Sequence, residues 1–338
     1  MAADLPGLGS SAAQVIPPAR RRFRRPSAKI IAGLGILAFF VLMAIIGPMA
    51  APYDPSAIGP DMLAPPSAAH LLGTTQTGQD VLSQLLDGAG PTLIVGFAAG
   101  AIATALSVVV GVSAGYFGGV AEEGLSLLAN IFLVIPALPL LVVLTGFLHS
   151  TSNLAIAIVI AVTGWAWGAR VLRAQTLAVR RQDYVASARA AGERAWRIIL
   201  LEILPNEVAI AATSFLFTVV VAILTDAYLI YLGLGPINTW SWGSMLYWVQ
   251  NNEAFTSGAW WWYVPPGLCI ALLGTGLALV NFGIDEFINP RLRAGGLSRR
   301  SVRRASKSHG LTLVLRPDGV RDDGTLTPVR ARPAGTRR

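Results

Sequence analysis

Six long runs of apolar residues, separated by polar segments, dominate the pattern of this chain. They cover residues 30–50, 93–117, 125–148, 154–169, 208–234 and 263–282. A helix needs about 20 apolar residues to cross a hydrocarbon core of about 30 Å. The pattern therefore predicts an all-α, polytopic membrane protein with six transmembrane helices.

The basic residues are confined to three segments. Of the 26 Lys and Arg residues, six precede the first run, seven lie between the fourth and fifth runs, and thirteen follow the sixth. The segments 51–92, 149–153 and 235–262 contain none. Because cytoplasmic segments carry the excess of Lys and Arg, both termini and the long loop after the fourth run are predicted to be cytoplasmic.

Composition excludes other classes of protein. Hydrophobic residues make up 54% of the 338 positions and charged residues only 13%, whereas about 25% are charged in a soluble domain. The net charge of +8 follows from membrane topology, so no nucleic-acid partner is expected. The first run is longer than the apolar core of a signal peptide, which favours an uncleaved first helix over a cleaved leader. The single cysteine and three distant histidines show no metal-site spacing.

Three regions are predicted along the chain. Residues 1–29 form a basic cytoplasmic N-terminal segment, and residues 30–294 form the transmembrane domain with a loop at about 173–205. Residues 295–338 form a basic, flexible cytoplasmic tail. This tail either touches anionic lipid heads or is solvated, and the composition favours neither alternative.

The chain contains no nucleotide-binding motif. A phosphate-binding P-loop needs a lysine after glycine, but Lys29 follows Ala28 and Lys307 follows Ser306. The chain is therefore expected to be no enzyme and to bind no cofactor, so that any nucleotide hydrolysis takes place in another subunit. The Gly-x-Ser-x-Gly pattern at 111–115 lies inside a predicted span, which favours a small-residue packing face over a nucleophile.

The segment before the fifth run is amphipathic and interrupted by one glycine. It is predicted to form two cytoplasmic helices that meet at Gly192, the second of them closed by Leu204 and Pro205. Glycine adopts backbone angles that other residues avoid. The small residues just before Gly192 would let the surface of a partner approach closely, whereas an ordinary surface loop would not need this spacing.

This segment resembles the Glu-Ala-Ala loop of permease subunits of ATP-binding-cassette importers, which has the spacing E-A-A-x3-G-x9-I-x-L-P. Four residues match outright: Ala188, Gly192, Leu204 and Pro205. Ser187 replaces an alanine, Ala186 replaces the glutamate and Glu202 replaces the isoleucine. The resemblance implies that the helix before Gly192 contacts the ATPase, through a set of residues that comprises Ala186, Ser187, Ala188, Arg189, Ala190, Ala191, Gly192, Leu204 and Pro205.

Further segments are similar to the permeases of dipeptide and oligopeptide importers. Residues 70–83 resemble the H-x-L-G-T-D-x-x-G-R-D-x-L-S segment of that family, with Thr75 and Gln79 in place of its Asp and Arg. The family's L-G-L-G, W-G-x-M-L and N-P-R-L segments have counterparts at residues 232–235, 242–246 and 289–292.

The resemblance implies a C-type permease with a type I importer fold in the bacterial inner membrane. It also implies a second homologous permease, ATP-binding-cassette subunits that bind ATP and Mg, an extracytoplasmic peptide-binding protein, and contact with membrane lipids. The expected function is di- and oligopeptide import by alternating access. Import of another small solute, such as a nickel chelate or glutathione, stays open, as does a membrane scaffold without transport.

Two features inside and beside the spans are open to more than one interpretation. Asp226 is an acid well inside the fifth run, where it either lines the pathway or makes a structural hydrogen bond. Six of the nine tryptophans lie between residues 240 and 262. The preference of indole for the headgroup zone favours an aromatic belt over a peptide-binding surface.

Overall fold

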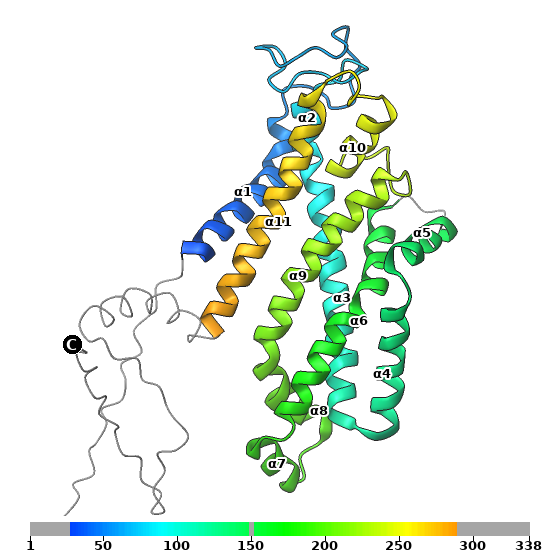
Figure 1. Ribbon diagram of the computed structural model, residues 1–338. Coiled ribbons are helices and arrows are strands. Elements are labelled where there is room, and N and C mark those ends of the chain that lie inside the picture. The colour runs from blue at the N-terminus through cyan, green and yellow to red at the C-terminus, as the bar shows by residue number, and fades with distance from the viewer. Residues whose placement is uncertain (1–27, 149–151, 289–338) are drawn as a thin grey trace, which may run out of the picture. The chain divides into compact units, whose positions relative to one another are not determined.

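The computed structural model describes residues 28–148 and 152–288 (Figure 1). The predictions for residues 1–27, for the 289–292 motif and for the tail at 295–338 lie outside these residues. The described part of the chain is helical and contains no strand. Its helices are α1 (Ala28–Ala50), α2 (Val81–Asp87), α3 (Ala89–Phe117), α4 (Gly119–Val134), α5 (Ala137–Leu148), α6 (Asn153–Val179), α7 (Asp183–Ala190), α8 (Ala195–Ile198), η1 (Ile199–Ile203), α9 (Leu204–Tyr231), α10 (Trp242–Asn251) and α11 (Trp260–Ile288).

Among the described residues, five helical stretches are long and apolar enough to cross a membrane, and a sixth crossing results if the bent pair α4 and α5 counts as one. The first, second, fifth and sixth predicted spans correspond to α1, α3, α9 and α11. The predicted all-α, polytopic fold is confirmed.

The third predicted span is not one helix. Its two halves, α4 and α5, are bent by 91° at a break around Ile135 and Pro136. Ile135 has extended backbone angles, as expected for a residue whose helical conformation would clash with the proline that follows. The apolar composition continues through the break, which is why hydropathy alone predicted a continuous span.

The fourth predicted span ended too early. Helix α6 runs from Asn153 to Val179, ten residues beyond the predicted end at residue 169. Arg170 and Arg173 therefore lie on the helix and not in the following loop. Both are good helix formers, so the helix continues where the apolar run stops.

Helices α3, α6 and α9 pack together, and α1 packs along α11 (Figure 1). The predicted packing face at 111–115 is confirmed, because a Cβ added to Gly111 would lie 2.5 Å from the Ala169 carbonyl oxygen. Ser107 on α3 also donates a hydrogen bond of 2.7 Å to the carbonyl of Trp165 on α6. Small residues thus let these backbones approach closely, as is common between membrane helices.

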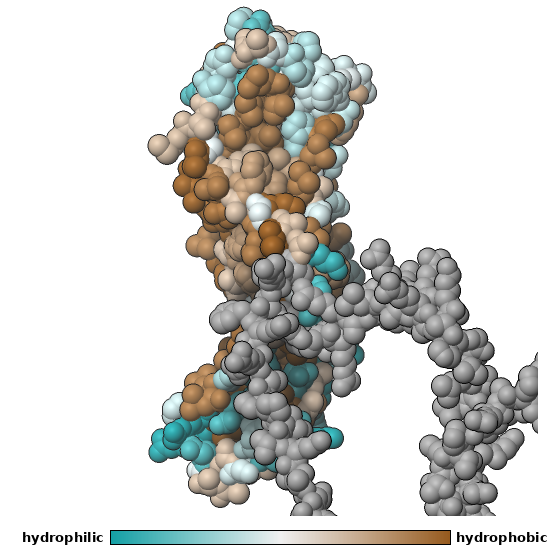
Figure 2. Space-filling view, turned by 90° about the vertical axis from the view of Figure 1, so that its left-hand side faces the viewer, coloured by the Kyte–Doolittle hydropathy of each residue, from teal (hydrophilic) through white to brown (hydrophobic). Residues whose placement is uncertain are grey.

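The bundle has two polar ends. One carries α7 and is called the α7 end here; the other carries α2, α10 and the loop at 51–80, and is called the α10 end (Figure 1). On the face shown in Figure 2, hydrophobic side chains form a band between hydrophilic side chains at both ends. The band matches a surface that is solvated by lipid in its middle part.

Candidate functional site

The strongest candidate site is the loop that joins α6 to α9 at the α7 end. Helix α7 spans Asp183–Ala190 and ends in a Schellman motif, in which the Glu193 amide donates to the Ala188 carbonyl at 3.2 Å. Gly192 has φ of +78°, so it occupies the left-handed conformation that the sequence predicted for this position. The chain leaves this turn into α8, which begins at Ala195.

The second helix is not closed by Leu204 and Pro205, contrary to the prediction. Helix α8 continues through the π-helical turn η1 directly into α9. Pro205 lies in the first turn of α9, directly after the π-helical turn that interrupts the regular hydrogen-bond pattern of the helix. The second half of the loop therefore continues as one helical segment into the long apolar helix α9.

The loop is anchored to the bundle by one buried side chain. Val185 is fully buried and packs in an apolar cluster with residues from the ends of α3 and α6 and from the start of the α8 to α9 stretch. These residues are Val112, Tyr116, Val179, Ile198 and Ile203. Sequence reasoning missed this anchor, although Val185 is the only aliphatic residue larger than alanine in α7, which was the available signal.

Polar contacts add to this anchor. The Arg189 guanidinium lies 4.8 Å from the centre of the Tyr116 ring, which connects α7 to the end of α3. Glu207, fully buried in the first turn of α9, accepts a hydrogen bond of 2.8 Å from the Thr176 hydroxyl on α6. The first contact ties α7 to α3, and the second ties α6 to α9.

The predicted contact residues fall into two groups. Ala186, Ser187, Ala190, Ala191 and Gly192 are exposed on α7 and the turn that follows it, and no atom lies within 4 Å of a Cβ added to Gly192. The remaining residues contact the bundle or lie on α9. Ala188 and Leu204 are half-buried against the Val185 cluster, and Arg189 is exposed and lies over Tyr116. Pro205 is exposed on α9.

Asp226 belongs to a different region. It lies 21 residues after Pro205 on α9, which corresponds to about 32 Å along a helix. Its side chain is 2% exposed, and its Oδ1 atom has no hydrogen-bond partner among the described residues. The structure thus shows no structural hydrogen bond to this atom.

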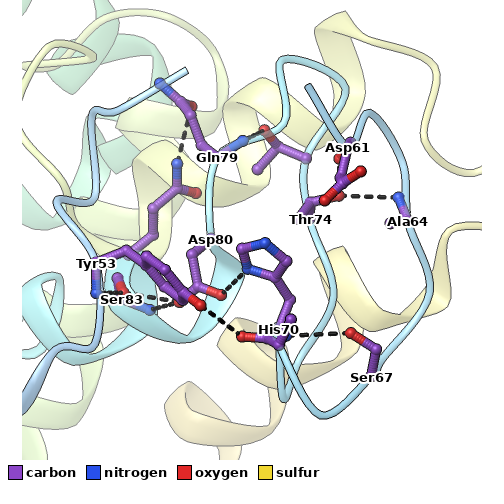
Figure 3. A network of polar contacts seen from close by, with 12 residues as sticks. Tyr53, Asp61, Ala64, Ser67, His70, Thr74, Gln79, Asp80 and Ser83 are labelled. Carbon is purple, nitrogen blue, oxygen red and sulfur yellow. Dashed lines mark hydrogen bonds and ion pairs between the residues drawn. The ribbon is translucent and has the colours of Figure 1, made fainter. Parts of the chain in front are cut away.

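The α10 end holds a dense polar network (Figure 3). Asp80 caps α2 by accepting hydrogen bonds from the amide and hydroxyl of Ser83, at 2.8 and 2.7 Å. Its other oxygen contacts Nδ1 of His70 at 2.9 Å, and the Tyr53 ring stacks against His70 with centroids 4.9 Å apart. The loop at 51–80 is thus held by specific polar contacts.

The two departures from the family segment lie next to each other in this network. The Gln79 amide donates to the Thr75 hydroxyl at 3.1 Å, and the Thr75 amide donates to the Gln79 carbonyl at 2.9 Å. The Gln79 side chain also accepts a hydrogen bond of 2.9 Å from Gln84. Neutral hydrogen bonds therefore stand where the family has an acid and a base.

The tryptophans hold the α10 end together, which differs from the predicted aromatic belt. The indole of Trp242 is fully buried and donates to the Leu85 carbonyl at 3.1 Å. Trp261 donates to the Thr74 carbonyl at 3.2 Å, and Trp240 donates to the Ser56 hydroxyl at 3.0 Å. Buried indoles are inaccessible to lipid heads, so the interpretation as a belt is wrong for Trp242 and also for Trp262, which is 2% exposed.

The fold and this loop define a helical, polytopic membrane protein with a helical loop at one end that Val185 anchors to the bundle. Residues 107–294 match a family described as binding-protein-dependent transport system inner membrane component, and residues 19–66 match the N-terminal TM domain of oligopeptide transport permease C. The chain belongs to this family of transport permeases.

Several relatives of this chain are transport system permease proteins. The chain is 32% identical to the oligopeptide transport system permease protein OppC of Bacillus subtilis over 277 residues, which cover 80% of this chain and 88% of the relative. It is 33% identical to the dipeptide transport system permease protein DppC of the same organism, over 78% and 82% of the two chains. It is also 33% identical to the probable D,D-dipeptide transport system permease protein DdpC of Escherichia coli, over 77% and 86%.

Proposed function

We propose that this permease is one half of the translocation pathway of an importer for di- or oligopeptides in the bacterial inner membrane, with the α7 end and both termini in the cytoplasm. The conformational change of a separate ATPase is transmitted to this permease through the loop between α6 and α9. The observation that carries this proposal is the set of exposed small residues on α7, a helix that Val185 anchors to the transmembrane bundle.

The exposed small residues of α7 suit close packing against another protein. Because Ala186 stands where the family has glutamate, this position offers the ATPase no ion pair. Two large side chains beside the small residues are exposed in the isolated chain: Tyr184 at 41% and Trp196 at 59%. Aromatic residues are enriched at protein interfaces, so they supply apolar contact area that the ATPase would cover.

Other subunits complete the machine. A second homologous permease supplies the other half of the pathway, and the ATPase subunits bind ATP and Mg. An extracytoplasmic binding protein delivers the peptide to the α10 end. The loop at 51–80, which Trp240 and Trp261 hold by hydrogen bonds, offers the binding protein an ordered surface. The assignment of peptides as substrates is supported by the named relatives, while nickel chelates and glutathione are the alternative solutes.

Within the pathway, Asp226 is proposed to contact the substrate or its water. A buried carboxylate without a partner is costly in an apolar bundle, and this cost is tolerated more readily where a ligand or the second permease completes the environment.

Site-directed cross-linking tests the coupling contact. Ser187→Cys places a thiol on the exposed surface of α7, and Ser257→Cys places one at the opposite end of the bundle as the matched control. In the assembled transporter, a short thiol-to-amine cross-linker is expected to join position 187, and not position 257, to the ATPase. Equal cross-linking from both positions, or none from position 187, would contradict the coupling assignment.

Uptake by reconstituted vesicles tests the substrate class. Labelled di- and oligopeptides are expected to accumulate when ATP is present, and unlabelled peptide is expected to compete. Accumulation of a nickel chelate or of glutathione without peptide uptake would show that the substrate assignment is wrong while leaving the permease role intact. A scaffold without transport predicts accumulation of none of these solutes.

A further inference from the structure

A small polar cavity lies between α3, α4 and α6, near the α7 end. Its volume is about 120 Å³. Small residues of α3, including Gly111 and Ala114, form one wall. Ser126 and Asn130 face it from successive turns of α4, and Arg170 and Arg173 face it from successive turns of α6. No residue of the proposed coupling contact lines this cavity.

Two donors in this cavity lack an acceptor. The Nε atom of Arg173 and the hydroxyl of Ser126 are both buried and have no hydrogen-bond partner among the described residues. Arg173 uses another nitrogen, Nη2, to pair with Glu122 on α4. Burying an unsatisfied donor costs free energy, so a ligand with an acceptor that reaches both Arg173 Nε and the Ser126 hydroxyl would stabilise the cavity.

The charge of the site favours an anionic acceptor. Glu122 neutralises one of the two arginines, which leaves one positive charge of the pair without an acid partner in the cavity lining. A guanidinium presents several donors in a planar fork that matches the oxygens of phosphate. The ligand chemistry indicated by these groups is therefore a phosphate ester.

The depth of the cavity identifies the source of that phosphate. Helix α6 begins at Asn153, and a hydrocarbon core of about 30 Å takes up about 20 helical residues. Arg170 and Arg173 therefore lie close to the boundary between hydrocarbon and headgroups at the α7 end. At this depth phospholipid phosphates are present at high local concentration.

An apolar surface leads from the cavity toward the middle of the bundle. Leu127, Ile131 and Val134 share one side of α4 at helical spacing, and their side chains are 62%, 48% and 81% exposed. This side is adjacent to the one that bears Ser126 and Asn130. It provides a track for an acyl chain whose phosphate occupies the cavity.

We propose that the cavity between α3, α4 and α6 binds the phosphate of one phospholipid from the leaflet at the α7 end, with its acyl chain along α4. Arg170, Arg173 and Ser126 hold the phosphate oxygens. On the orientation proposed above, this leaflet is the cytoplasmic one. Since the proposal concerns lipid retention, its failure and the failure of the transport assignment are distinguishable.

Lipid retention by the assembled transporter tests this proposal. The purified complex in detergent is titrated with phosphatidylglycerol, and bound lipids are counted by native mass spectrometry. Arg170→Gln combined with Arg173→Gln is expected to weaken the tightest lipid site at least about tenfold, because charge-assisted hydrogen bonds to the phosphate are lost. Ser126→Ala, which keeps both charges, is expected to weaken it about fivefold.

Two matched controls separate the cavity from general charge effects. Glu122→Gln removes the ion pair but keeps both arginines, so binding is expected to be unchanged or tighter. Arg181→Gln removes an exposed charge that does not line the cavity, and it is expected to leave the tightest site unchanged.

Three comparison ligands identify the source of the phosphate. Diacylglycerol with the same acyl chains is expected to bind weakly at this site, because it lacks the phosphate. Inorganic phosphate alone and a transported peptide are expected to leave the lipid in place. Displacement of the lipid by either, equal retention of diacylglycerol, or unchanged binding in the double arginine variant would each overturn the proposal.

Discussion

Replacing Gly192 tests whether the geometry of the loop, and not merely its small size, matters for coupling. With φ of +78°, Gly192 ends α7 in a conformation that costs other residues about 1–2 kcal/mol. Gly192→Val adds a β-branched side chain, which disfavours this conformation most strongly. No atom lies within 4 Å of the added Cβ, so the penalty arises from the backbone and not from a clash within the chain.

A penalty of this size lowers the ratio of native to non-native loop conformations by a factor of about 5–30. We expect ATP-dependent uptake by Gly192→Val vesicles to fall measurably, by at most this factor of about 5–30, while α9 and the rest of the bundle fold normally. The assay is uptake in proteoliposomes with equal amounts of assembled complex, measured together with ATPase activity.

Gly192→Asn is the matched variant, because asparagine tolerates the left-handed conformation far better than valine. It adds a side chain of similar size but is expected to keep most of the uptake. Full uptake by the valine variant would refute the argument from backbone geometry. Equal loss in both variants would show instead that the ATPase needs the space above Gly192.

Three further predictions concern the spans and the α10 end. Asp226→Asn is expected to lower uptake while raising thermal stability, because it removes a buried charge without a partner; unchanged uptake would exclude a pathway role. Asp80→Ala is expected to cost about 0.5–2 kcal/mol in thermal unfolding through loss of the α2 cap, whereas Asp80→Asn should retain most of that cap; equal losses would contradict the capping role. Gly111→Val is expected to destabilise the bundle by about 1–3 kcal/mol, because its Cβ would meet the backbone of Ala169; wild-type stability in detergent would show that α3 and α6 pack less closely than described.

Apolar run length predicted the spans well because lipid imposes a minimum length on any crossing helix. Run length predicted the helix boundaries wrongly in two places, where the apolar run and the helix do not end at the same residue. Apolar composition continues through Pro136, yet the proline breaks the helix into α4 and α5. Conversely, apolar composition stops at Arg170, yet α6 continues because arginine is a good helix former.

The turn at Gly192 was predictable because its cause is local: a glycine that follows a short helix can adopt positive φ. The anchoring of α7 was not, because Val185 packs against Tyr116 from a distant part of the sequence. The tryptophans illustrate the same limit. Composition places them near a membrane surface, but the partner of Trp261 is the Thr74 carbonyl, 187 residues away.

The proposed coupling of ATP hydrolysis by the partner ATPase to import by this permease is tested by measuring both processes simultaneously. In proteoliposomes that contain the assembled transporter and its binding protein, labelled peptide inside the vesicles and phosphate released from ATP are followed over time. Coupled transport predicts that peptide accumulates only while ATP is hydrolysed and that addition of loaded binding protein raises both rates. An assembled complex that hydrolyses ATP at the same rate with and without peptide, and accumulates no solute, would contradict it.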